Sequence, residues 1–338
     1  MNLSIGIIGL PNVGKSTLFK LLTKQEVNIA NYPFTTIDPN VAVVSVVDER
    51  LEKITQISKP EKVIPAVIEF FDIAGLVKGA NKGEGLGNQF LAQIREANAI
   101  VQVVRCFLKE TVAHIEGGID PQRDIEVVNT ELVLKDLETV EKRINKIEGE
   151  ARAGNKDITK ELEILNQIKN LLNQGSLLVN FLSEELLENS AVKDLNFLTA
   201  KKQIFLFNGE DKDVPKEVIN FVEQLKSEYI IADLETNPDL LELIKKAYQV
   251  LGLISFFTIV GEKEARAWPA KKGIKAQEAA GMIHSDFADK FIKAEVINWQ
   301  KLLEADKWST ARQKGWIQLE GKEYEVQDGD VIIFKHGG

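Results

Sequence analysis

One stretch of the sequence has residue types and spacing suited to phosphate binding. Gly9 to Ser16 read Gly-Leu-Pro-Asn-Val-Gly-Lys-Ser and match G-x-x-x-x-G-K-[ST] at every fixed position. In this pattern the glycines let backbone N–H groups curl around phosphate oxygens, and the start of a helix adds a favourable dipole. We therefore expect Asn12, Val13 and Gly14 to line a nucleotide-binding loop.

The polar side chains at the end of this loop have distinct expected roles. Lys15 should reach the β- and γ-phosphates of a nucleoside triphosphate, and the Ser16 hydroxyl should bind Mg²⁺. Thr17 should donate its backbone N–H to the α-phosphate. These residues predict a P-loop nucleoside triphosphatase site.

Two later segments could complete the metal site. The segment NYPFTTIDPN supplies the Thr36 hydroxyl, which can bind Mg²⁺ when the γ-phosphate is present. The bland alternative is that its threonine pair forms only a turn or cap. Farther on, Asp72 follows an apolar run, where its carboxylate would bind Mg²⁺ through water and the Gly75 N–H would contact the γ-phosphate. The expected Mg²⁺ ligands are therefore Ser16, Thr36 and Asp72.

A base-reading element is expected at the end of a later strand. The run IFLFNGED ends with Asn208, and N-x-x-D spacing places Asp211 in the acidic position, with Gly209 where a lysine is usual. A carboxylate can accept both N–H groups of guanine, so Asp211 favours GTP if it points inward. An ordinary turn is the alternative.

The elements that must position these residues follow an α/β order. A predicted strand, LSIGIIGL, precedes the loop, and a predicted helix, KSTLFKLLTK, follows it. The later β-rich runs alternate with helical patterns, which indicates a parallel central sheet. These later runs are VAVVSVV, VIPAVIEFFDIAG, AIVQVVRCF and QIFLFN.

Two further regions interrupt and end this pattern. From Asp124 to about Ala200 the sequence is charged, and its apolar residues recur four and three apart. That spacing predicts a hairpin of two antiparallel helices inserted in the α/β domain, or an amphipathic pair packed on it. Its apolar members are Val133, Leu137, Val140, Ile144, Ile147, Ile158, Leu162, Leu165 and Leu172. From about Ser255 onward, short strands and turns predict a small β-rich domain.

Composition excludes several classes of protein. No run of 18 apolar residues exists, and Met1 leads directly into a strand, so we expect a cytoplasmic protein without a membrane segment. The only cysteine, Cys106, lies in an apolar run, where a buried structural thiol is expected. The net charge of −9 argues against non-specific nucleic-acid binding by the whole chain.

Taken together, these motifs make the chain resemble the YchF subfamily of Obg-like translation-factor NTPases. The matching strings include GLPNVGKSTLF, NYPFTTIDPN, DIAGLVKGA, HIEGGIDPQRDIEVVNTELVLKDLE and VQDGDVIIF. The resemblance implies ATP hydrolysis in preference to GTP, a G domain over residues 1–252 interrupted by a helical insertion over 124–200, and a TGS domain of β-grasp fold over 253–338. It also implies contact with the ribosome or ribosomal RNA. A monomer is the expected oligomeric state.

Three departures from the family pattern bear on these implications. Relatives usually have N-x-x-E with an extra residue, whereas NGED is one residue shorter, so either Glu210 or Asp211 could take the acidic position. Many relatives have cysteine before the switch threonine, where this chain has Thr35. The region after Asp211 is also shorter than in typical members, which affects the loop that closes over the base.

The attacking water has no obvious partner. Small GTPases commonly place glutamine directly after the D-x-x-G glycine, but this chain has Leu76, which cannot hydrogen-bond. The resemblance points to His114, in the loop TVAHIEGGID, as the catalytic residue, while a structural histidine is the alternative. Asn12 could instead help to hold K⁺ beside the phosphates, or a ribosomal partner could complete the site.

A ribosome contact would need a local basic surface. Residues 253–338 contain 13 basic and 13 acidic residues, so this part is neutral. A patch that combines cations with an aromatic ring could face RNA, or it could be a solvated charged turn. Its residues are Arg266, Trp268, Lys271, Lys272 and Lys275. Two rivals to the translation-associated switch are a nucleotide-gated binding module with incidental turnover and a metabolic kinase.

Overall fold

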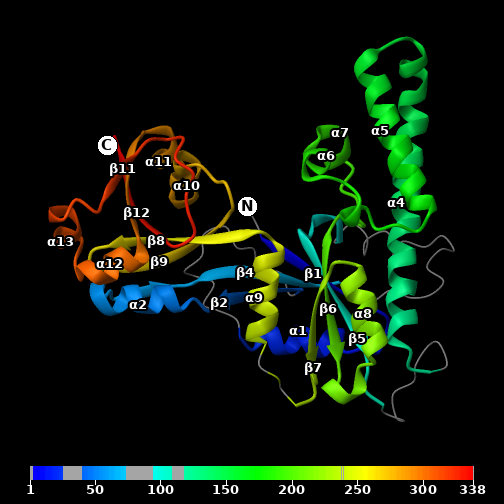
Figure 1. The fold of residues 1–338 in the computed structure, drawn as a ribbon, viewed down its shortest axis with the longest axis horizontal. Coiled ribbons are helices and arrows are strands. Elements are labelled where there is room, and N and C mark those ends of the chain that lie inside the picture. The colour runs from blue at the N-terminus through cyan, green and yellow to red at the C-terminus, as the bar shows by residue number, and fades with distance from the viewer. Residues whose placement is uncertain are drawn as a thin grey trace. The chain divides into compact units, whose positions relative to one another are not determined.

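A computed structural model describes residues 3–25, 40–73, 94–108, 118–236, 238 and 240–337. Contacts divide the chain into two compact units, which are shown in Figure 1. The first comprises residues 1–24, 37–42 and 69–250, and the second comprises 25–36, 43–68 and 251–338. No helix in the described ranges is long and apolar enough to span a bilayer.

The first unit is built on a six-stranded sheet with the order β2-β4-β1-β5-β6-β7. The strands are β1 (Ser4–Ile8), β2 (Val41–Val46), β4 (Ala66–Asp72), β5 (Ala99–Arg105), β6 (Lys202–Asn208) and β7 (Glu228–Ala232). β1 pairs in parallel with β4 and β5, and β6 pairs in parallel with β5 and β7. The predicted parallel α/β sheet is therefore confirmed.

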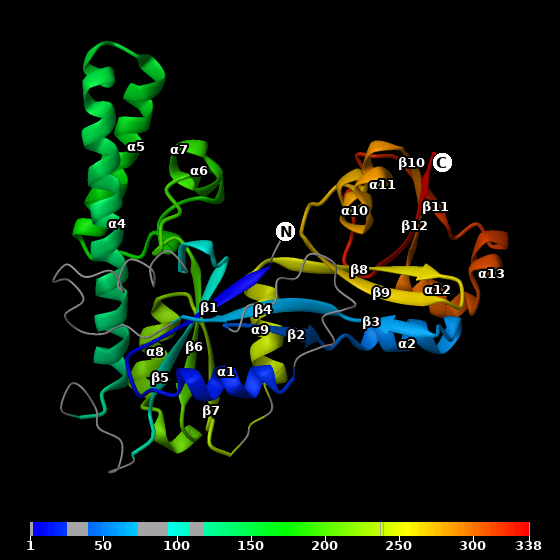
Figure 2. The ribbon, with the colours of Figure 1, turned by 180° about the vertical axis from the view of Figure 1, so that it is seen from behind.

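Helices cover both faces of this sheet because its strands are apolar on both sides. α4 (Pro121–Arg152) and α8 (Lys216–Gln224) bury Ile125 and Val218 against Phe205 and Phe207 of β6. α9 (Leu241–Val250) lies on the opposite side of the strands from α8 (Figures 1 and 2). α1 (Lys15–Thr23) follows β1 directly, so its first turn stands at the carboxyl end of the sheet.

The predicted helical hairpin is formed by α4 and α5 (Lys156–Asn173). All nine apolar residues that the spacing singled out belong to one cluster between the two helices. Asn155 caps α5 by accepting hydrogen bonds from the Asp157 and Ile158 N–H groups. Three short helices follow, namely η2 (Leu178–Asn180), α6 (Glu184–Glu188) and α7 (Ser190–Lys193).

A buried polar cluster ties α4 to the chain that enters β6. The Asp136 carboxylate is fully buried and accepts bonds from the Leu198 N–H at 3.0 Å, the Thr199 N–H at 2.8 Å and the Thr199 hydroxyl at 2.7 Å. Nearby, Arg95 donates to the Thr139 hydroxyl at 2.7 Å. Burial lowers the pKa of Lys201, which donates to the Arg95 carbonyl, to about 8. The base of the helical pair is thus held by hydrogen bonds as well as by apolar packing.

The second unit contains another six-stranded sheet, with the order β11-β10-β12-β8-β9-β3. Its strands are β3 (Lys62–Ile64), β8 (Leu253–Val260), β9 (Glu264–Lys271), β10 (Phe291–Asn298), β11 (Gln318–Glu320) and β12 (Asp330–His336). β8 and β9 form an antiparallel pair, β12 runs parallel to β8, and β10 is antiparallel to β12. This is the strand arrangement of the predicted β-grasp domain.

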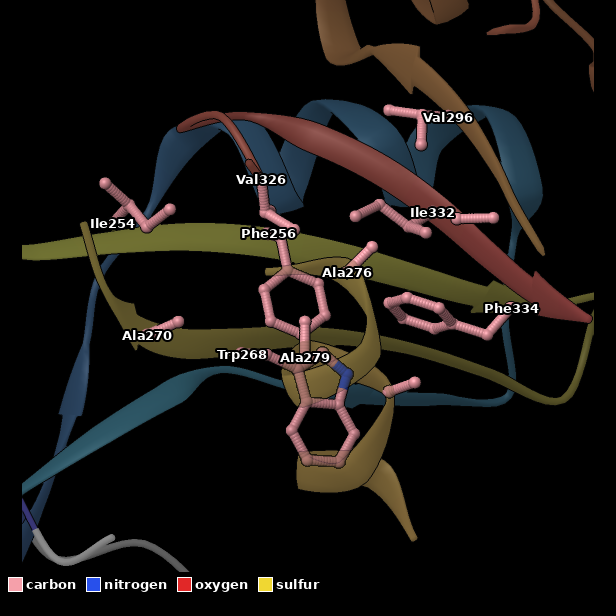
Figure 3. Close-up of a cluster of buried hydrophobic side chains, with 12 residues drawn as sticks. Ile254, Phe256, Trp268, Ala270, Ala276, Ala279, Val296, Val326, Ile332 and Phe334 are labelled. Atoms are coloured by element: carbon pink, nitrogen blue, oxygen red, sulfur yellow. The ribbon is translucent and has the colours of Figure 1, made fainter. Parts of the chain in front are cut away.

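One face of this sheet is covered by α10 (Ala276–Ile283). Figure 3 shows its alanines against Phe256, Trp268 and Phe334, whose large rings fill the space that the small residues leave. Three shorter helices complete the region, namely α11 (Ser285–Asp289), α12 (Trp299–Ala305) and α13 (Trp308–Gln313). The alanines of α10 bring only methyl groups to this cluster, and Met282 and Ile283 of the same helix also pack against it.

The contact-based units follow the chain differently from the predicted domain ranges, which stay a prediction. The change of unit after Val250 lies close to the predicted boundary at 252, but residues 43–68 also belong to the second unit. β3 is its edge strand, and α2 (Glu49–Ser58) packs against β9 and α12. An amphipathic helix pattern predicts that a helix buries one face, and it does not say which core receives that face.

We expect Asp136→Ala to lower the free energy of unfolding by about 3 kcal/mol, because it strands two buried N–H groups and a hydroxyl. Asp136→Asn should lose about half as much, since one acceptor oxygen remains. Urea unfolding followed by far-ultraviolet circular dichroism measures both. The control is Asp157→Ala, which removes an exposed carboxylate near the start of α5. A loss equal to that of the control would show that the cluster does not stabilise the fold.

Candidate functional site

The loop between β1 and α1 has the backbone geometry of an anion cradle. Asn12 and Gly14 have φ angles of 62° and 112°, in the left-handed region. A side chain at Gly14 would place its Cβ 2.4 Å from Asn208 Nδ2, and one at Gly9 would meet the Val103 carbonyl oxygen at 2.4 Å. Both glycines are therefore required for the loop to pack against the ends of β5 and β6.

The first turn of α1 supplies the donors. No side chain caps this helix at Gly14, and the first hydrogen bond that closes its first turn runs from the Leu18 N–H to the Gly14 carbonyl at 2.9 Å. The N–H groups of Lys15, Ser16 and Thr17 thus have no acceptor within the helix, as at any helix start. These three amides and the helix dipole favour an anion such as a phosphate.

Lys15 is already directed into this loop. It is only 8% exposed, and its Nζ donates to the Leu10 carbonyl at 2.7 Å. Burial lowers its pKa to about 8, against the opposing effect of the Asp72 carboxylate. The ammonium therefore spans the loop, where a phosphate could replace the carbonyl as its acceptor.

Asp72 stands at the end of β4, next in the sheet to the strand that leads into the loop. Its pKa is raised by burial and lowered in part by the Lys15 charge. Ser16 is exposed at the start of α1. A hydroxyl and a carboxylate are the hard oxygen ligands that Mg²⁺ prefers, so the described ligands fit this ion. The described residues contain no cluster of three or more His, Cys, Asp or Glu side chains that could bind a different metal.

Asn208 connects two walls of the site. It is 3% exposed, its Nδ2 donates to the Val13 carbonyl at 2.9 Å, and its Oδ1 accepts from the Leu234 N–H at 3.1 Å. The sequence predicted a nucleotide-binding residue here, and the structure shows that the amide holds the phosphate loop to the chain beyond β7. No sequence signal identifies the Val13 and Leu234 partners, because they contribute backbone atoms.

A pocket of about 480 Å³ lies at the carboxyl ends of β6 and β7. Ligands of open α/β sheets bind at this edge. Its lining includes both acidic candidates for base recognition, Glu210 and Asp211. Glu210 caps η3 (Asp211–Asp213) and pairs with Lys212 at 2.6 Å. In the part of the chain that the structure describes, the Asp211 carboxylate has no hydrogen bond or ion pair, so of the two it has the freer carboxylate for a base.

Three of the predicted site residues lie outside the described residues, namely Thr36, Gly75 and His114, as does Leu76. Cys106 is buried as expected, and burial, with Asp213 and Asp124, raises the pKa of its thiol to about 12. The thiol is therefore protonated at neutral pH and poorly reactive.

The expected aromatic surface around Trp268 is wrong. This side chain is 7% exposed, its Nε1 donates to Thr258 Oγ1 at 2.9 Å, and its ring stacks on Phe256 with 6.3 Å between centroids. Arg266 covers the ring at 3.9 Å. Lys271 and Lys272 are exposed. The patch thus retains cations and has no accessible tryptophan ring on which a base could stack.

The strand, cradle, buried lysine and acidic strand end define the class of P-loop nucleotide-binding proteins. A family model described as "50S ribosome-binding GTPase" matches residues 4–146, and the model YchF-GTPase_C, described as "Protein of unknown function", matches residues 253–337. The chain is 44% identical to the "Ribosome-binding ATPase YchF" of Bacillus subtilis and 43% identical to that of Mycoplasma genitalium, with at least 98% of each chain covered.

A solved structure is also similar along the whole length. The Schizosaccharomyces pombe YchF GTPase has 34% sequence identity and a TM-score of 0.87, with 99% of this chain and 98% of that chain covered. This chain belongs to the YchF family.

We expect Asn208→Ala to weaken ATP binding at least tenfold, about 1.4 kcal/mol, because the Val13 carbonyl and Leu234 N–H lose the group that joins them. Isothermal titration calorimetry measures the affinity. Asn166→Ala is the matched control, since among the described residues that amide bonds to the Leu162 carbonyl alone, on an exposed stretch of α5. Unchanged affinity in a folded Asn208→Ala protein would contradict the positioning role.

Proposed function

We propose that this protein binds Mg²⁺ and ATP at the Gly9–Ser16 loop, hydrolyses ATP to ADP and phosphate, and acts as a nucleotide switch on the ribosome. The observation that carries the proposal is the buried Lys15 ammonium, which donates to the Leu10 carbonyl across the loop at 2.7 Å, at the start of a helix that no side chain caps. The ATPase activity and ribosome binding named for the relatives support it. The cytoplasm, where ribosomes lie, is the proposed location, with a monomer as the acting species.

The protein groups divide the work of phosphate transfer. The amides of Lys15, Ser16 and Thr17 hold phosphate oxygens, and the Lys15 ammonium balances the charge that moves onto the β–γ bridge. Ser16 and Asp72, with Thr36 of the undescribed segment, would hold Mg²⁺. Held by these oxygen ligands, Mg²⁺ would supply positive charge against the phosphates of the nucleotide. Asn208 keeps the loop in register with the base pocket through its bond to Val13.

The choice of base depends on the pocket beyond β6. The family names support ATP, whereas an inward carboxylate of Asp211 would accept the N1–H and N2–H groups of guanine. Adenine presents one donor group beside an acceptor, so it pairs less well with a carboxylate. We therefore propose ATP as the substrate and GTP specificity set by Asp211 as the second candidate.

Activation of the water is assigned to a group other than Leu76, which has no polar atom. His114 is the proposed catalytic residue, because a near-neutral imidazole can orient or deprotonate water. The second candidate is K⁺ held beside the phosphates with the help of Asn12, which is exposed and has a φ of 62°. A ribosomal group acting in trans is the third candidate for activating the water.

Calorimetric titration of ATP and GTP, each with and without K⁺, tests the site and its base. We expect ATP to bind at least tenfold more tightly than GTP, and Lys15→Ala to abolish binding of both. The Lys20→Ala variant, which removes an exposed lysine from the same helix, serves as the control. Tighter GTP binding would favour the second candidate, and full binding by Lys15→Ala would refute the phosphate-loop assignment.

For His114→Ala we expect single-turnover ATP hydrolysis to fall about a hundredfold while ATP affinity stays within twofold. The physical reason is that the imidazole would act on the water and not on the nucleotide. Quenched-flow detection of phosphate measures the rate, and His284→Ala provides a control histidine that is exposed in the second unit. An unchanged rate would remove His114 from the mechanism and leave K⁺ or a partner.

A nucleotide switch must bind its target differently in its nucleotide states. We expect sedimentation with ribosomes to retain at least fivefold more protein with a non-hydrolysable ATP analogue than with ADP. Equal sedimentation in both states would eliminate the switch, even if the protein hydrolyses ATP. Sedimentation that differs between states in a protein without measurable turnover would instead support a gated binding module.

A further inference from the structure

The segment between the two predicted metal-binding stretches belongs to the C-terminal unit. Residues 43–68 follow the stretch that contains Thr36 and precede Asp72, yet they are packed with residues 251–338. β2 and β4, at the two ends of this segment, are strands of the nucleotide-binding sheet. The chain therefore leaves that sheet, contributes to the second unit and returns to end at a predicted metal ligand.

Backbone hydrogen bonds attach the end of this segment to the second sheet. β3 pairs in parallel with β9, with Lys62 opposite Glu264 and Ile64 opposite Arg266. The Glu61 and Lys62 N–H groups donate to the Glu262 and Lys263 carbonyls at 2.8 and 3.1 Å. A single residue, Pro65, separates β3 from β4, whose other end is Asp72.

Side chains of α2 form a second attachment. The Arg50 guanidinium bonds to the Asp328 carboxylate at 2.7 Å and lies 5.4 Å from the centre of the Phe257 ring. One turn later, Lys53 lies over the Trp299 ring at 5.7 Å. Arg50 also bonds to Asp48, which caps the start of α2, so the contact is made by an ordered helix start.

The Asp328 carboxylate, to which Arg50 bonds, is itself held by a backbone hydrogen bond. Asp328 Oδ1 accepts from the Ser255 N–H of β8 at 2.9 Å. The adjacent Gly329 has a φ of 91°, and its carbonyl accepts from the Trp299 backbone N–H at 3.0 Å. It leaves no room for a side chain, since a Cβ would lie 2.6 Å from the Trp299 indole ring. Movement of α2 relative to this turn would break the Arg50–Asp328 bond and the contacts with the two rings.

We propose that residues 43–68 carry the nucleotide state of the site to the C-terminal domain. Ile68 and Phe70 of β4 are fully buried, so a shift of Asp72 on loss of its metal contact would be passed along this strand. Because only Pro65 separates β4 from β3, such a shift would strain the pairing of β3 with β9 and the contact of Arg50 with Asp328. The proposal rests on the proposed function, in that Asp72 must sense the nucleotide. By linkage, the attachment must affect nucleotide affinity in return.

Hydrogen exchange of the intact protein tests the transmission. Peptides that cover 61–64 and 264–266 are followed by mass spectrometry with saturating Mg²⁺–ADP and with a Mg²⁺-bound non-hydrolysable ATP analogue. We expect their exchange rates to differ at least threefold between the two states, while 331–335 of β12 exchange equally in both. Equal exchange at 61–64 and 264–266, with both nucleotides shown to be bound, would overturn the proposal.

A pair of matched variants tests the reciprocal effect. Arg50→Gln removes the contact to Asp328, whereas Arg312→Gln removes an ion pair with Glu295 at 2.6 Å that joins two parts of 251–338. We expect the ratio of ADP affinity to analogue affinity to change at least threefold in Arg50→Gln and less than twofold in Arg312→Gln. Equal ratios in both variants would refute the coupling.

The outcomes separate this inference from the function on which it rests. Failure of the unmodified protein to bind either nucleotide would refute the proposed function itself, and intact binding with no coupling would refute only the route. Circular dichroism checks that the variants are folded. If Arg50→Gln is not, Asp328→Asn gives the same test, because its Oδ1 can still accept from the Ser255 N–H while the charge opposite Arg50 is lost.

Discussion

The bond from the Asn208 amide to the Val13 carbonyl is the contact on which the site depends. An anion cradle needs backbone N–H groups that point at one place, and a glycine-rich loop does not hold such a shape by itself. Asn208 is buried, and its other amide atom accepts from the Leu234 N–H, so one side chain joins the loop, the end of β6 and the chain beyond β7. The same contact requires glycine at position 14, because a Cβ there would clash with the Asn208 side chain.

Two charged side chains of opposite sign, Lys15 and Asp72, lie beside this cradle and favour the binding of a phosphate together with a cation. Lys15 is buried and Asp72 is half-buried, and burial lowers the pKa of the Lys15 ammonium to about 8 and raises the pKa of the Asp72 carboxyl. A polyphosphate with a divalent cation would supply the opposite charge for each group. The ammonium would gain phosphate oxygens and the carboxylate would gain a metal, and both gains would offset the cost of taking these charges partly out of water.

The proposed nucleotide-dependent response of the C-terminal domain relies on how the chain is divided between the two units. A domain joined by a flexible linker would not respond to small shifts of a metal ligand. Here β3 and α2 are built into the second unit, and a buried strand leads directly from them to Asp72. The helical pair is attached in a different way, through the Asp136 cluster at its base, and all of its contacts with that cluster lie in the first unit.

The sequence by itself determined the phosphate loop, the parallel sheet, the seam of the helical pair and the β-rich end of the chain, because each depends on local spacing. The tertiary structure decided which partners these local patterns meet. Asn208 could be placed at a strand end, but its bonds to Val13 and Leu234 involve backbone atoms distant in sequence. Trp268 looked like a surface ring beside lysines, yet strand alternation turned it into the core under Arg266. In the same way, the predicted α/β domain included α2 and β3, whereas their packing assigns them to the second unit. An apolar helix face predicts that the face is buried, but it does not specify which surface buries it.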